Sequence, residues 1–281
     1  MTAWVVKLKT FGEKSIMRQA DAKKNNVAPL YWGCFLPRMA HLKINITYRC
    51  DRGCPNCNRA TKLCPSSVDE DLNPYLLAKM LEKCVSIGKQ WTHITLTGGE
   101  PTMHDKFGEF VDILSEYKKT NKMCTIETYT YHHPKYFYKI EDALAKHPEF
   151  MVRDTNKEVP RKHRWAIHKA PLDFPNRFPP DHFYVGCNDG ARMCGLGWDA
   201  SGFYCCPIGA SIARVFGFRR SVPIKDIADV TANKLIEQYP VLCSRCGQYP
   251  PFRAKKSEKD IISPTWSNAI EDFKWLKTLQ K

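Results

Sequence analysis

The sequence has no run of apolar residues long enough to cross a lipid bilayer. Residues 1–12 lack the apolar centre and the small-residue cleavage site of a signal peptide. There is no internal repeat, no low-complexity tract and no recognisable nucleic-acid-binding motif. We therefore expect a soluble cytoplasmic protein.

What the 281 residues do contain is enough apolar material for a packed core. Hydrophobic residues make up 43%, which argues against global disorder. The net charge of +14 allows two interpretations. It indicates either an anionic partner, such as nucleic acid, a phosphorylated substrate or an acidic electron carrier, or simply a solvated surface rich in lysine.

Cysteine is abundant, but its pattern does not fit a disulfide framework. There are 13 cysteines, an odd number, without an export signal. We expect reduced thiols that bind metal. Nine of them fall into two groups: Cys50, Cys54 and Cys57, then Cys187, Cys194, Cys205, Cys206, Cys243 and Cys246. Of the other four, Cys84 and Cys124 lie in apolar patterns and are expected to be small core residues.

The first group has the spacing C-x3-C-x2-C, in Cys50, Cys54 and Cys57. One short loop thus offers three thiolates and no fourth. A cubane iron–sulfur cluster has four irons, so three ligands leave one iron free to bind something else. The alternative is a zinc site, for which His104 or Cys64 would have to supply the fourth ligand.

The surrounding pattern predicts alternating strands and helices. Strands are expected at residues 41–47, 93–97, 123–128 and 150–153, with a further candidate at 165–168, and helices at 73–88, 107–119, 136–147 and 263–280. Such alternation builds a parallel sheet whose functional loops follow the carboxyl ends of the strands. The cysteine loop follows the first strand, and Gly98-Gly99-Glu100-Pro101 follows the second. We expect both motifs to meet at one pocket.

These two motifs, in this order and spacing over residues 40–155, resemble the radical S-adenosylmethionine (SAM) superfamily. The resemblance implies a [4Fe–4S] cluster on Cys50, Cys54 and Cys57, with SAM chelating the free iron. Reductive cleavage of SAM would give a 5′-deoxyadenosyl radical that abstracts hydrogen from a substrate.

The resemblance also assigns a cofactor-binding role to Gly98, Gly99, Glu100 and Pro101. Glycine lets the backbone approach the methionine part of SAM, and Glu100 or nearby carbonyls would take its ammonium group. Many relatives carry an aromatic residue before the third cysteine. This chain has Asn56 there, which weakens the expected contact with adenine.

The second cysteine group is similar to the twitch form of the SPASM auxiliary-cluster extension. We expect one auxiliary [4Fe–4S] cluster beside a hairpin at residues 198–204. The expected ligands are Cys243 and Cys246, then Cys206 in preference to Cys205, and Cys187, Cys194 or both. A zinc knuckle is the alternative for these residues.

Together these patterns predict an α/β protein with a partial, shortened (β/α)6-type TIM barrel and a small cysteine-rich extension. The expected divisions are an N-terminal extension (1–39), the barrel (40–182), the auxiliary-cluster domain (183–250) and a helical tail (251–281). We expect an oxidoreductase-type radical SAM enzyme that receives electrons from an acidic flavodoxin or ferredoxin. Its substrate, whether small molecule, nucleotide or peptide, stays open. The alternative function is a zinc-stabilised, non-catalytic nucleic-acid-binding protein.

Overall fold

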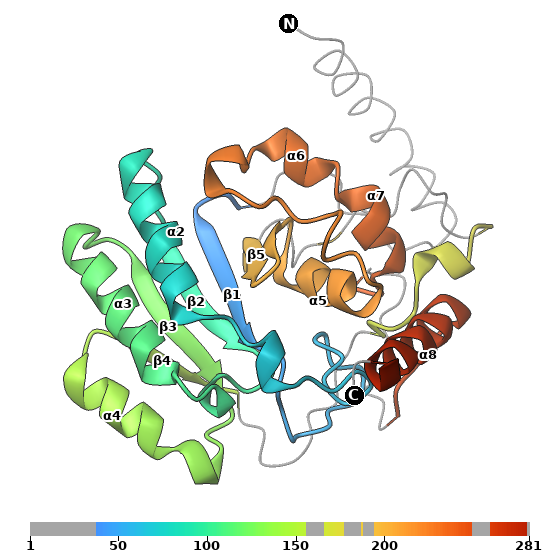
Figure 1. Ribbon diagram of the computed structural model, residues 1–281, viewed down its shortest axis with the longest axis horizontal. Helices are drawn as coiled ribbons and strands as arrows, with labels where there is room; N and C mark the ends of the chain where they lie inside the picture. Colours follow the sequence, from blue (N-terminus) through green and yellow to red (C-terminus); the bar gives the residue numbers. More distant parts are fainter. Residues whose placement is uncertain (1–37, 156–165, 177–186, 188–193, 249–258, 280–281) are drawn as a thin grey trace, which may run out of the picture.

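The computed structural model describes residues 38–155, 166–176, 187, 194–248 and 259–279 (Figure 1). Almost all of the predicted N-terminal extension lies outside the described residues. Among the helices that are described, none is both long and apolar enough to cross a membrane.

A single six-stranded sheet, mainly parallel, forms the centre of the protein. Its strands lie in the order β4-β3-β2-β1-β5-β6. They are β1 (His41–Thr47), β2 (His93–Gly98), β3 (Thr125–Thr130), β4 (Met151–Asp154), β5 (Leu196–Asp199) and β6 (Gly202–Tyr204). The first five strands are parallel to their neighbours, and only β6 runs antiparallel, to β5. The α/β class with a partial barrel is therefore confirmed.

Three helices cover one face of the sheet: α2 (Pro74–Ser86), α3 (Phe107–Thr120) and α4 (Tyr138–Lys146) (Figure 1). Helix α2 begins where the sequence predicts, because the Asn73 side chain accepts a hydrogen bond from the Tyr75 N–H and Pro74 occupies the first turn. Leu77, Leu81 and their neighbours along the same stripe are buried against the sheet.

The C-terminal half adds α5 (Pro207–Val215), α6 (Ala232–Ile236), α7 (Tyr239–Leu242) and α8 (Pro264–Leu279). The predicted hairpin is present as β5 and β6, and β5 pairs directly with β1. The cysteine-rich half thus extends the same sheet that carries the first cysteine loop, and α5 packs on β5 and β6.

One prediction about secondary structure is wrong in detail. Residues 166–168 form a turn instead of a strand, because Lys169 N–H bonds to Ala166 O and Gly247 N–H bonds to Ile167 O. The predicted C-terminal helix is present as α8, with Trp266 and Ile270 buried and Trp275 and Leu276 exposed.

Candidate active site

The loop that follows β1 places three cysteine side chains within eight residues. Cys54 is buried, whereas Cys50 and Cys57 are half-buried. The backbone bends sharply here, since Gly53, Asn56 and Ala60 all have positive φ angles of 58°, 53° and 52°. The Thr61 hydroxyl lies 3.7 Å from the Cys57 sulfur. The local winding thus keeps the three thiols on one compact loop.

The glycine loop after β2 lies directly against the start of the cysteine loop. Gly99 N–H bonds to Thr47 O and Glu100 N–H bonds to Arg49 O, each at 2.8 Å. A Cβ on Gly98 would lie 1.9 Å from Thr47 O, and one on Gly99 would lie 2.1 Å from Arg49 O. The two glycines are therefore required for the close approach of the two loops, whatever binds beside them.

Glu100 is buried, and its carboxylate is fully occupied by protein groups. It accepts hydrogen bonds from Thr102 N–H at 3.3 Å, Thr102 Oγ1 at 2.7 Å, Thr130 Oγ1 at 2.6 Å and Tyr131 N–H at 3.1 Å. Glu100 therefore joins the end of β2 to the end of β3. Because the Glu100 carboxylate already accepts these hydrogen bonds, the loop carbonyls are better candidates than Glu100 to accept from the ammonium group that the resemblance implies.

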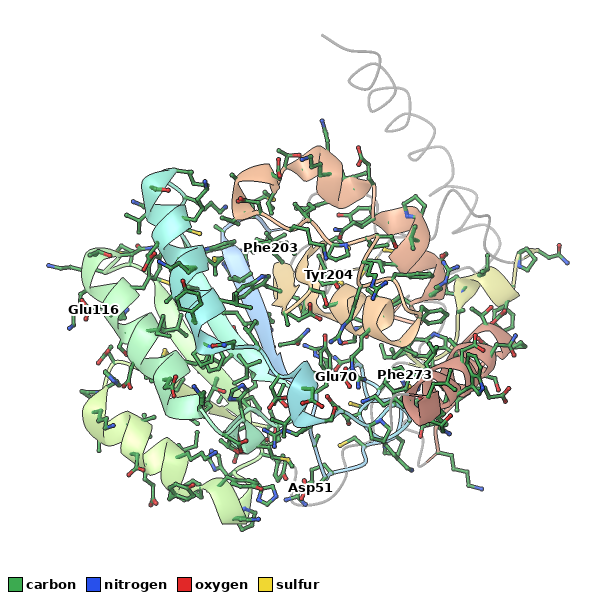
Figure 2. The ribbon with its side chains drawn as sticks, in the orientation of Figure 1. Asp51, Glu70, Glu116, Phe203, Tyr204 and Phe273 are labelled. Atoms are coloured by element: carbon green, nitrogen blue, oxygen red, sulfur yellow. The ribbon has the colours of Figure 1, made fainter. Side chains whose placement is uncertain are left out.

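Asp51 connects the cysteine loop to the segment after β3. Its carboxylate accepts a hydrogen bond from the Tyr131 hydroxyl and lies 2.9 Å from His133 Nε2. Burial raises the pKa of Asp51, but the bond from Tyr131 and the charge of His133 outweigh burial and leave the pKa lowered. Figure 2 shows Asp51 at the end of the molecule where the loops gather.

Asn56, which stands where many radical SAM proteins have an aromatic residue, binds the segment before α8. Its backbone N–H donates to Asp260 Oδ1 at 2.6 Å, its side-chain Nδ2 donates to Lys259 O at 3.1 Å, and its Oδ1 accepts from Ile261 N–H at 2.9 Å. His168 adds to this junction, because its Nε2 lies 3.1 Å from Cys57 O and its Nδ1 lies 3.4 Å from Asp260 Oδ1.

Four cysteines of the second group line one cavity between α5 and α7. They are Cys187, Cys206, Cys243 and Cys246, together with apolar neighbours such as Leu242. Cys206 caps α5, where its sulfur accepts from Gly209 N–H at 3.2 Å. A hydrogen bond from Cys205 lowers the pKa of the Cys206 thiol, although burial acts in the opposite direction. Burial raises the pKa of Cys246.

The structure places the remaining predicted ligand, Cys194, elsewhere. Cys194 lines a separate cavity of about 180 Å³ with Lys43, Glu127 and Arg153. The thiol of Cys205 is buried beside Cys206 and Cys243. Which of these thiols would bind a cluster is taken up below as a proposal.

A comparison with protein-family models finds a match over the same two loops. Residues 44–173, which span both loops and the strands that carry them, match the family model of the Radical SAM superfamily. Over this stretch, a little under half of the chain, the sequence is similar to the radical SAM superfamily. A [4Fe–4S] cluster and SAM are the cofactors of radical SAM chemistry. Three thiols on one loop, with no fourth, suit a cubane that keeps one iron open.

Other similarities are more distant, and no curated protein matches the sequence. Two crystal structures of SuiB from Streptococcus suis, with precursor peptide SuiA and with S-adenosylmethionine, align at TM-scores of 0.32 each, with 19% and 17% identity. They cover 51% and 54% of this chain, which spans 27% and 30% of theirs.

BtrN in complex with AdoMet and 2-DOIA aligns at a TM-score of 0.44 with 12% identity, over 80% of this chain and 98% of BtrN. Similarities this weak support no conclusion about the substrate or the mechanism of this chain.

The two candidates for a fourth zinc ligand at the first cysteine loop are engaged elsewhere or buried in the core. His104 Nε2 lies 2.9 Å from Leu72 O, and its Nδ1 accepts from Lys106 N–H at 3.0 Å, so both ring nitrogens have partners. Cys64 is fully buried in the hydrophobic core. Within the described ranges, no three His, Cys, Asp or Glu side chains lie close enough to hold a single metal ion.

Sequence reasoning missed a partly buried charge cluster around Glu70, which follows the cysteine loop (Figure 2). The Glu70 carboxylate lies 2.6 Å from Arg214 Nε, 3.1 Å from Arg219 Nη1 and 2.6 Å from Lys277 Nζ. Arg214 on α5 and Lys277 on α8 join both helices to the segment after the cysteine loop, a relationship between distant segments that no local pattern in the sequence indicates.

Proposed function

We propose that this chain is a radical SAM enzyme that holds a [4Fe–4S] cluster through Cys50, Cys54 and Cys57. SAM would bind at Gly98-Gly99-Glu100-Pro101. The observation that carries the proposal is the backbone contact between the two loops, where Gly99 N–H and Glu100 N–H bond to the residues that open the cysteine loop. When bound, these cofactors supply a 5′-deoxyadenosyl radical that abstracts hydrogen from substrate.

The chain's own residues would hold these cofactors in place. Glu100 fixes the glycine loop to the end of β3, so the loop carbonyls are held rigidly for the ammonium group of SAM. Asp51 near the start of the cysteine loop binds His133, and Asn56 near its end binds the segment at residues 259–261. A loop anchored on both sides costs little reorganisation when its ligand binds.

We also propose that the second cysteine group holds one auxiliary [4Fe–4S] cluster. Its support is that Cys187, Cys206, Cys243 and Cys246 line one cavity. Four thiolates would leave no iron open, so this cluster would serve electron transfer, and the net reaction would be oxidation of substrate or cross-linking. The basic chain, with its charge of +14, would receive electrons from an acidic flavodoxin or ferredoxin.

The polar cavity lined by Lys43, Glu127 and Arg153 also includes His41 and His93, the first residues of β1 and β2, so it lies away from the two loops and is not assigned to the substrate. Glu127 is buried and lies 3.0 Å from Arg153 Nε and 2.8 Å from His93 Nε2. Burial raises the pKa of Glu127, but these two partners lower it to about 2, so the carboxylate stays ionised.

The test is anaerobic turnover of the reconstituted protein with reductant and SAM, measuring 5′-deoxyadenosine. The expected result is a brown protein with about eight irons that releases 5′-deoxyadenosine. The variant Cys54→Ala should release none, whereas Cys84→Ala, a core thiol remote from both cysteine groups, should keep the activity. A colourless protein with stoichiometric zinc and no product would overturn the proposal in favour of a binding protein.

A further inference from the structure

Arg59 is a buried cation that lies two residues after the last cysteine of the first loop. Only 6% of the residue is exposed. Its Nε donates to Asn45 Oδ1 at 2.9 Å, but its Nη1 is buried and has no hydrogen-bond partner among the residues that the structure describes. A buried donor without an acceptor costs about 1–3 kcal/mol, and more when it carries charge.

Arg59 also lacks the counter-charge that the neighbouring arginines have. Arg214 and Arg219 both lie against the Glu70 carboxylate. Arg59 forms no ion pair with any carboxylate of the described ranges, unlike these two. A guanidinium taken out of water without an anion is strongly destabilising. The arrangement therefore indicates that an anion outside the described residues completes this site.

The contacts of Asn45 place Arg59 next to the second cysteine group. Asn45 Nδ2 donates to Pro207 O at 3.3 Å, while its Oδ1 accepts from Arg59. Pro207 is the first residue of α5, and Cys206 is the cap of that helix. Two hydrogen bonds through one amide thus connect Arg59 to the residue that follows Cys206.

Arg59 therefore stands near both cysteine groups. It lies two residues after Cys57, and through Asn45 it is joined to the first turn of α5, the helix that Cys206 caps. A cubane held by four thiolates carries net negative charge, which is the anion that Arg59 lacks.

We propose that Arg59 is the buried counter-charge of the auxiliary cluster and raises its reduction potential. This inference rests on the proposed function, because it needs a cluster at Cys187, Cys206, Cys243 and Cys246. A positive charge in a region of low dielectric constant favours the reduced, more negative form of a cluster. Arg59 thus lies between the two cysteine sites, and its charge makes the auxiliary cluster a better electron acceptor.

The test measures a midpoint potential, which a merely structural residue would not shift. The background is the triple variant Cys50→Ala, Cys54→Ala, Cys57→Ala, which leaves only the second site, titrated anaerobically by electron paramagnetic resonance. Arg59→Met should lower the midpoint potential of the auxiliary cluster. Arg59→Lys, which retains the positive charge, should lower it only slightly. The matched control is Lys62→Met, which removes the same charge from an exposed position of the same loop, where solvent screens it, and should leave the potential unchanged.

Each outcome decides the matter. If the cluster is present and Arg59→Met shifts its potential no more than Lys62→Met does, the inference is wrong and the proposed cluster stands. If the triple variant binds no iron, the auxiliary cluster and the inference both fail, whereas the first cluster stays testable in the intact chain. If Arg59→Met does not fold, Arg59→Gln and Arg59→Lys provide the comparison, and equal potentials for these two would overturn the role of charge.

Discussion

Asn56 donates its backbone N–H to the Asp260 carboxylate at 2.6 Å, so a residue of the cysteine loop is bound to a residue more than 200 positions later. The other two polar groups of Asn56 are satisfied by Lys259 and Ile261. Asn is one of the few residues that tolerate the positive φ of 53° found here. The cysteine loop is therefore completed by the segment that precedes α8.

The first prediction follows from this contact. Asn56→Ala should remove two side-chain hydrogen bonds and strain the backbone, at a cost of about 2–3 kcal/mol of unfolding free energy. It should also lower the iron bound by the first site. Denaturant unfolding and iron analysis check this. Asn58→Ala, in the same loop, has no bond to residues 259–261 and should change neither quantity. Equal effects of both variants would contradict the role of Asn56.

A second prediction concerns the glycine loop. Gly99→Ala should cost about 2–4 kcal/mol, because its Cβ would lie 2.1 Å from Arg49 O and the two loops would have to separate. Gly108→Ala is the control. Gly108 lies in α3 with nothing within 4 Å of an added Cβ, so the substitution should stabilise the helix by up to about 1 kcal/mol. Thermal unfolding measures both. A Gly99→Ala protein as stable as the parent would show that the loops do not need their close contact.

The strands and helices of residues 41–154 could be predicted well because their burial follows a local period. In β1, Leu42, Ile44 and Ile46 alternate with polar residues, and in α3 Phe107, Phe110 and Leu114 recur at helical spacing; all six are buried. Residues 166–168 have the same β-type composition, but the backbone there bonds to Gly247, a partner that no local pattern specifies. The strand prediction failed for that reason.

The candidate site shows the same division between local and distant information. The spacing of Cys50, Cys54 and Cys57 is contained in one loop, so the motif alone indicates three thiols together. The choice between Cys187 and Cys194 depends on how a segment folds back beside α5 and α7. Only the structure shows that Cys187 shares a cavity with Cys206 while Cys194 lies beside Glu127.

This placement leads to a third prediction, about the second site. Cys246→Ala should lose about four of about eight irons and keep 5′-deoxyadenosine production in the uncoupled reaction, because the first site is intact. Cys194→Ala should retain all of the iron, since its thiol lies in the other cavity. Iron and sulfide analysis of anaerobically prepared protein measures the difference. Loss of iron in Cys194→Ala but not in Cys246→Ala would reverse the assignment.

The last prediction concerns the pH dependence of stability. Burial alone would raise the pKa of Glu70, but the hydrogen bonds and charges of Arg214, Lys277 and Arg219 lower it to about 2, from an ordinary value of 4.5. A carboxyl group whose pKa is lower in the folded protein stabilises the fold above pH 4.5. That contribution is lost as the pH falls from 4.5 through about 2. Glu70→Gln should therefore lower the unfolding free energy by about 3 kcal/mol at pH 7. As the pH is lowered below 4.5, the unfolding free energy of this variant should fall less steeply than that of the parent protein.

Glu116→Gln is the matched control for this prediction, because Glu116 is exposed on α3 (Figure 2). Within the described residues its ion pair is with Lys119, across one helical turn. Its effect should stay below about 0.5 kcal/mol at any pH. Denaturant unfolding between pH 7 and pH 3 separates the two variants. Parallel curves for Glu70→Gln and the parent protein would mean that the carboxylate of Glu70 is not held ionised by its three cations, and that α5 and α8 depend on apolar packing alone for their attachment to the cysteine loop.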